Sequence, residues 1–262
     1  MNRLLRILLL VALLLCAAAA QAQAFVQKTQ GSSGFAGSLA LPAFASSVGT
    51  GNTVIVGAAA YKNFAPAPTI TVSDNKGNTY SAAIGPTRDA RGNLYTFYAF
   101  NVTGGTNFIV TLTISDADSK PIGIAAEYSS IATTAPLDKT AGAFDTSTAA
   151  SSGATATTTQ ATELVFGVVY TTDLETNITA GTGYTERAEE DNVANGFTMS
   201  IMDKNVTSTG AQTVTATVST FDQWICQAST YKAAAAASIP PPRRIIITGA
   251  PWPGRAAAEA DR

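Results

Sequence analysis

Residues 94–128 read LYTFYAFNVTGGTNFIVTLTISDADSKPIGIAAEY, and this stretch contains the pattern that decides the fold. Successive side chains of a β-strand point to opposite faces of the sheet, so alternation of apolar and polar residues predicts a strand with one buried and one wet face. Gly104-Gly105 is typical of the turn that begins such a strand. The alternating residues are Phe108, Val110, Leu112 and Ile114 on the dry face, with Thr111, Thr113 and Ser115 on the wet face.

The same pattern returns about a hundred residues later, over residues 197–231. Val110 corresponds to Val214 at an offset of 104 residues, and Tyr128 corresponds to Tyr231 at an offset of 103. This correspondence predicts that the chain is built from two repeated halves. Chance similarity is the competing explanation, because alternation of Thr and Val is common in β proteins.

A continuous apolar run precedes each alternating stretch, TVIVGAAA at 53–60 and LVFGVVY at 164–170. Runs of this length predict strands that are buried on both faces. Aligning them places Val56-Gly57 on Phe166-Gly167, and the pseudo-repeats then cover about 53–128 and 164–231. The predicted fold is all-β, an antiparallel two-sheet β-sandwich of jelly-roll type.

Two turn-centred segments are predicted to be β-hairpins. In residues 69–83, the sequence DNKGN at 74–78 supplies the turn, and Gly77 is free to take a positive φ. Residues 178–187 form a shorter counterpart, in which Tyr184 corresponds to Tyr80 of the first segment.

The first 24 residues predict a secretory signal peptide. Asn2, Arg3 and Arg6 form a short basic n-region, residues 4–20 are otherwise apolar, and Ala22-Gln23-Ala24 matches an A-x-A cleavage site. The mature chain is therefore expected to begin at Phe25, to be secreted to the cell surface, the extracellular space or the periplasm, and to have no membrane segment. An uncleaved membrane anchor is the alternative interpretation.

The remaining boundaries follow from composition. Residues 132–161 are rich in Thr, Ser, Ala and Gly, and we expect one or two exposed edge strands there rather than a plain linker. Residues 233–262 contain Ala, Pro and Arg without sandwich periodicity and are predicted to be a disordered tail. Residues 25–232 are thus the expected β-sandwich domain.

Charge and cysteine content exclude several functions. Residues 25–232 hold 10 Lys and Arg against 16 Asp and Glu, and a net charge of about −6 argues against a nucleic-acid partner. After cleavage Cys226 is the one remaining cysteine, so no intramolecular disulfide can form. Stability must therefore come from burial of the core.

Three motifs together resemble a family of poorly characterised modules of secreted and surface-exposed bacterial proteins. The motifs are SDNKGNTY at 73–80, NVTGGTN at 101–107 and AAEYS at 125–129. This chain departs from the pattern at Ser130, where those modules more often have Gly soon after the Tyr. The resemblance covers about 50–232 and implies a jelly-roll or Ig-like sandwich in an extracellular compartment. It implies no catalytic residues.

Calcium is the one cofactor that the sequence allows us to consider, since Ca²⁺ prefers clustered oxygen ligands. Asp116 and Asp118 are the better candidates, although weak ones. The loop 74–78 is interpreted as a turn, because turns use the same residues and one carboxylate beside a Lys binds cations poorly. The three N-x-T sequons, at Asn101, Asn177 and Asn205, are likewise interpreted as turns and strand ends.

An enzymatic function is not expected. The chain contains no histidine, which is the commonest general base. A glycoside hydrolase could work with carboxylates alone, and Glu127 and the run Glu189-Glu190-Asp191 are the acids available for it. Our interpretation places Glu127 on the wet face of a strand and the acidic run in a solvated loop.

Two non-catalytic functions remain. The first is a structural or adhesive role in the cell envelope, with another envelope protein as partner. The alternative is a carbohydrate-binding module that places aromatic rings against the sugars of a polysaccharide. Packing in the core is the competing explanation for each ring. The candidate residues are Trp224, Tyr61, Tyr95 and Tyr98, with Phe64 as a further ring.

Overall fold

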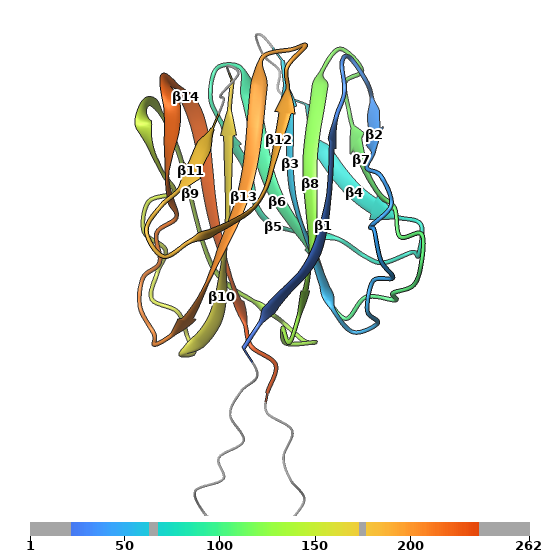
Figure 1. The fold of residues 1–262 in the computed structure, drawn as a ribbon, viewed down its shortest axis with the longest axis vertical. Helices are drawn as coiled ribbons and strands as arrows, with labels where there is room; N and C mark the ends of the chain where they lie inside the picture. The colour runs from blue at the N-terminus through green and yellow to red at the C-terminus, as the bar shows by residue number, and fades with distance from the viewer. Residues whose placement is uncertain (1–21, 63–67, 173–176, 236–262) are drawn as a thin grey trace, which may run out of the picture. The chain divides into compact units, whose positions relative to one another are not determined.

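The alternating segments form strands throughout the part of the chain that the structure describes (Figure 1). The computed structural model describes residues 22–62, 68–172 and 177–235, which lie within one compact unit, Ala19–Ala236. These residues contain strands and no helix, and all strand pairs are antiparallel. The predicted all-β antiparallel sandwich is confirmed. No membrane-spanning helix is found among the described residues.

The first half of the chain forms a five-stranded sheet and a smaller sheet that covers one of its faces. The large sheet has the order β1-β8-β3-β6-β5, and the cover has the order β2-β7-β4. The central strand β3 is buried along nearly its whole length, as its continuous apolar run predicts. The bounds are β1 Ala24–Ser32, β2 Ser38–Ala40, β3 Thr53–Tyr61, β4 Ile70–Asp74, β5 Ser81–Arg88, β6 Gly92–Ala99, β7 Val110–Ile114 and β8 Lys120–Ser129.

The second half forms another large sheet, in the order β11-β14-β10-β13-β12, with β9 paired along the free side of β14. Its central strand β10 is again buried. The bounds are β9 Leu137–Ser151, β10 Thr162–Thr171, β11 Ile178–Ala180, β12 Thr185–Asn192, β13 Phe197–Thr207 and β14 Thr215–Lys232.

Strand β14 bends so that its first residues cover the sheet to which its last residues belong. Ala216 and Val218 share one buried cluster with Val165 and Val169 of β10. Val214, just before the strand, comes so close to Gly167 that a Cβ on Gly167 would lie 2.5 Å from its Cγ1, so only glycine fits there. The start of β14, the end of β9 and β11 therefore cover the second large sheet as β2-β7-β4 covers the first.

The two large sheets pack against each other around a central core of aromatic and aliphatic side chains. Tyr128 of β8 and Phe166 of β10 meet edge to face, with ring centroids 6.1 Å apart. The Tyr128 hydroxyl donates a hydrogen bond of 2.8 Å to Asp203, which also accepts two hydrogen bonds from Arg187. A buried tyrosine needs such a partner, because an unpaired hydroxyl in an apolar core is costly.

The two halves share their strand order, but sequence duplication itself stays a prediction. In each large sheet the central strand, β3 or β10, lies between two corresponding neighbours. One neighbour is the strand that contains the matched tyrosine, β8 or β14, and the other is β6 or β13. Val110, in the first cover, and Val214, beside the second, are both buried between a cover and its large sheet, as predicted. One detail of the alignment is wrong: Phe166 faces the central core, whereas Val56 faces the cover. Because faces alternate with every residue, a shift of one residue, pairing Ile55 with Phe166, corrects it.

The two predicted hairpins are wrong, although their turns are correct. Gly77 takes φ 78°, as the turn requires. However, β4 pairs with β7 of the cover, while β5, after the turn, pairs with β6 of the large sheet. The same crossing occurs between β11, which pairs with β14, and β12, which pairs with β13. Turn residues show that a chain reverses, but not which sheet it enters next.

The segment between the halves contains a strand, as expected. Strand β9 lies at an edge and is largely exposed or half-buried. At the end of the domain, Ala233 and Ala234 still donate backbone hydrogen bonds to Thr162 and Ser130, so the folded part extends past Lys232. Most of the predicted leader and tail, residues 1–21 and 236–262, lies outside the described residues.

Candidate functional site

An open cleft of about 250 Å³ lies where β3 ends and β8 begins. We call it the Phe35 cleft, and its lining residues are Phe35, Tyr61, Lys62, Asp118 and Lys120. It brings together one predicted ligand-binding residue, Tyr61, and one predicted calcium ligand, Asp118. Phe35 was not predicted.

Strand pairing and loop hydrogen bonds fix the lining residues. Tyr61 ends β3 and is the direct strand partner of Lys120, which begins β8. The loop that carries Phe35 connects β1 to β2 and is attached to the start of β8 and to the turn before it. Its attachment consists of two backbone hydrogen bonds of 3.0 Å, from Ser33 to Pro121 and from Ala36 to Ser119. The cleft is therefore built on the hydrogen-bonded strands β3 and β8 and on a loop that is anchored to β8.

Two aromatic rings flank one cation in the cleft. The Lys120 Nζ lies 4.9 Å from the Phe35 ring centroid and 5.6 Å from the Tyr61 centroid, which is within cation–π range. The Tyr61 ring stacks on Phe197, with centroids 5.7 Å apart and an interplanar angle of 10°. Phe35 is 70% exposed although its backbone is held in place. The Phe35 ring therefore offers an apolar surface to solvent at the cleft.

The polar groups of the cleft are partly paired with one another. Lys62 forms an ion pair with Asp116. Asp116 also accepts a hydrogen bond of 2.9 Å from the backbone N–H of Asp118. Two further charged groups line the cleft outside this ion pair. They are the Asp118 carboxylate and the Lys120 ammonium.

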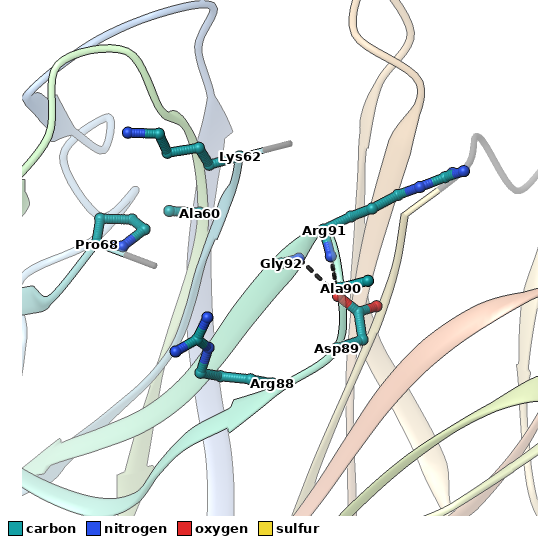
Figure 2. Close-up of a pocket in the computed structure, with 8 residues that line it drawn as sticks. All are labelled: Ala60, Lys62, Pro68, Arg88, Asp89, Ala90, Arg91 and Gly92. Carbon is teal, nitrogen blue, oxygen red and sulfur yellow. Dashed lines mark hydrogen bonds between the residues drawn. The ribbon is translucent and has the colours of Figure 1, made fainter. Parts of the chain in front are cut away.

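A second, smaller hollow adjoins the cleft at Lys62 (Figure 2). Asp89 organises its floor, because its Oδ1 accepts backbone hydrogen bonds from Arg91 (2.8 Å) and Gly92 (2.6 Å). Arg88 points toward Pro68, whereas the Arg91 side chain extends away from the hollow. Its volume of about 10 Å³ is room for about one water molecule, so it does not hold a sugar ring.

No protein-family model, curated protein or solved structure gave a significant match to this chain. The resemblance to secreted bacterial modules therefore stays a prediction.

Among the described residues, the other predicted aromatic side chains are buried or half-buried. Trp224 is 3% exposed and donates a hydrogen bond of 3.0 Å from its Nε1 to Ser147, so the prediction of an exposed ring is wrong. Tyr95 is also buried and stacks on Phe97. Tyr98 is half-buried and packs edge-on against Tyr231 of the central core. Phe64 lies outside the described residues.

Asp116 is engaged by protein groups, and calcium binding by Asp116 and Asp118 stays a prediction. An Asp116 oxygen is taken by Lys62, and its other interaction is with its own turn. Within the described residues, no group of three or more His, Cys, Asp or Glu is placed to hold a metal. In the loop 74–78, Asp74 accepts hydrogen bonds from the backbone of Lys76 and Asn78, as expected of a turn.

Glu127 is fully buried, so its predicted place on a wet face is wrong. Its carboxylate accepts hydrogen bonds from the Gly49 backbone (2.7 Å), the Asn52 amide (2.5 Å) and the Gln27 amide (2.7 Å). The bonds from Gly49 and Asn52 attach the loop before β3 to β8, and the bond from Gln27 joins β1 to β8. A buried carboxylate is stable only with such partners, because burying an unpaired charge is very costly.

The acidic run belongs to strand β12 rather than to a loop, and its carboxylates make structural contacts. Glu190 accepts hydrogen bonds from Gln30 and Ser32 of β1, which joins the edges of the two large sheets. Glu189 accepts from the backbone of Ile178 at the start of β11.

Sequence reasoning missed a pair of buried carboxyl groups, Asp138 of β9 and Glu163 of β10. Burial raises the pKa of Glu163 to about 7, and the neighbouring Asp138 carboxylate adds to the rise. Burial would also raise the pKa of Asp138, but hydrogen bonds from Thr159 and Lys139 outweigh it and lower that pKa to about 2. Glu163 is fully buried, so this pair is a structural feature of the β9–β10 junction.

Proposed function

We propose that the protein is an exported, non-catalytic β-sandwich module with an adhesive role, and that its Phe35 cleft binds carbohydrate. The observation that carries this proposal is the exposed Phe35 ring, held by an anchored loop beside Tyr61 and Lys120. The proposed partner is a polysaccharide of the cell exterior.

The chemistry of the cleft suits a sugar. The apolar C–H face of a pyranose packs on an aromatic ring, and the Phe35 ring offers one that is open to solvent. Sugar hydroxyls need hydrogen-bond donors and acceptors at the rim, and Lys120 and Asp118 can supply one of each. The cation–π contacts of Lys120 hold its ammonium beside the ring instead of leaving it free to rotate.

The non-catalytic part of the proposal rests on what the acidic residues do. The sequence contains no histidine, so carboxylates are the first candidates for acid–base catalysis. Glu127 and Glu163 are fully buried, and Glu189 and Glu190 hold strands together. Glu127, Glu189 and Glu190 could serve as general acids only by giving up contacts that support the fold, and the Glu163 side chain is closed off from solvent.

Export is proposed from the leader: two arginines, an apolar run and small residues at the cleavage position. Placing the binding cleft at loop ends of a sandwich is consistent with an adhesive role, because loop ends are the part of such a fold that a partner can reach.

The proposal is tested by binding of the purified protein to a panel of polysaccharides. Phe35→Ala should reduce binding about tenfold or more, since it removes the stacking surface but no buried contact. Phe221→Ala is the matched control: Phe221 is also strongly exposed, at 74%, but does not line the cleft, so its removal should leave binding unchanged. If no polysaccharide binds, or if both variants behave alike, carbohydrate binding at this cleft is refuted, and an envelope protein becomes the partner to search for.

A further inference from the structure

The end of the leader contains several possible cleavage frames. Signal peptidase requires small residues three positions and one position before the cut, and a run of alanines meets this need more than once. In this sequence the frames end at Ala19, Ala20, Ala22 and Ala24. The sequence pattern alone favours the last, which would make Phe25 the first residue.

The structure shows that the residues just before Phe25 belong to the fold. Gln23 is 3% exposed. Its backbone carbonyl accepts a hydrogen bond of 2.7 Å from the Asn205 amide, and its own amide donates a longer one of 3.4 Å to the Tyr231 carbonyl. Ala24 forms the first residue pair of β1 with β8, opposite Ser129.

Cleavage after Ala24 would remove these contacts and add a charge. The Asn205 amide would lose its acceptor, and the pairing of β1 with β8 would lose its first residue. A new α-ammonium would also appear on Phe25, whose ring lies 4.8 Å from the Arg187 guanidinium carbon.

Cleavage after Ala22 is unfavourable for a different reason. It would place the α-ammonium on Gln23, which is buried, and burying an uncompensated charge is costly. Ala22, by contrast, is exposed, so the chain that precedes Gln23 can leave the fold there without burying a charged terminus on Gln23.

We propose that signal peptidase cuts this chain upstream of Ala22, after Ala19 or Ala20, so that Gln23 and Ala24 remain in the mature protein as part of β1 and its entry. This inference rests on the proposed export of the protein.

Mass spectrometry of the N-terminal peptide, after export of the full chain from a bacterial host, tests the proposal. A first residue at Ala20 or Gln21 is the expected result. A first residue at Gln23 or Phe25 overturns the inference while leaving export intact. An exported fraction that lacks the protein, or a chain that retains Met1, overturns both the inference and the proposed export.

A stability comparison tests the physical reason independently of processing. Chains produced without a leader and beginning at Gln21 or at Phe25 are compared by thermal unfolding, each with and without Asn205→Ala. The chain that begins at Phe25 should melt about 2–6 °C lower, the shift expected from losing one or two hydrogen bonds in a domain of this size. Asn205→Ala should lower the melting temperature of the longer chain but hardly that of the shorter one. Equal melting temperatures for the two chains, or equal effects of Asn205→Ala, would overturn the inference.

Discussion

Val110 and Val214 allow the architecture to be tested at two matched positions. Each is fully buried between a large sheet and its cover, one in each half of the chain. Val→Ala removes two methyl groups and leaves a cavity, so each substitution should lower the free energy of unfolding by about 1–3 kcal/mol. Val214 should fall in the upper part of this range, because Gly167 and the bent β14 pack closely around it and leave little freedom to collapse.

The controls are Thr113→Ala and Thr217→Ala. Each threonine is exposed and lies three residues after the valine with which it is compared, on the opposite face. They should cost at most about 1 kcal/mol, the range of strand propensity on a wet face. Urea unfolding followed by circular dichroism measures all four variants, with the slope of the transition as a check on the unfolded state. The reasoning is refuted if either Val variant costs no more than its Thr control, because the cover would then not enclose that side chain.

Two further predictions concern the ends and junctions of the domain. The raised pKa of Glu163, about 7 against 4.5 for an ordinary Glu, means that the folded state holds this proton more tightly than the unfolded state. Its stabilising contribution is therefore complete below about pH 4.5 and is lost as the pH rises through 7. Glu163→Gln should stabilise the protein at pH 8 by on the order of 2 kcal/mol and should flatten the pH dependence of the free energy of unfolding. A variant less stable than the native chain at pH 8 would contradict this. A chain ending at Ala235 should be more stable than one ending at Lys232 by about 1–2 kcal/mol in thermal unfolding, because the shorter chain lacks the backbone hydrogen bonds that Ala233 and Ala234 donate; equal stability would show that these bonds contribute nothing.

The strands and their buried faces could be predicted because their cause is local. The alternation around Val110 and Leu112 states directly which side chains leave water, and the structure buries those side chains. The partners of strands could not be predicted in the same way. The turn at Gly77 looks like that of a hairpin, yet β4 pairs with β7 of the cover and β5 pairs with β6 of the large sheet. Which sheet a strand joins depends on the tertiary packing of its side chains, and the turn residues carry no information about that packing.

The site was predicted only in part, for a related reason. Tyr61 and Trp224 look alike as aromatic candidates in a sequence, but one ends a central strand and the other packs under the bend of β14. Phe35 gave little signal, since it stands alone in a Gly- and Ser-rich segment without any period. A single large apolar residue in such a segment was the available clue. Its meaning depends on Lys120, which is brought beside it only by tertiary structure.

A crystal structure of the protein with an oligosaccharide from the best-bound polysaccharide tests the central claim most directly. The account predicts a sugar ring stacked on Phe35, with hydroxyl groups within hydrogen-bond distance of Lys120 or Asp118. A sugar bound elsewhere on the protein, with the Phe35 cleft empty, would contradict it.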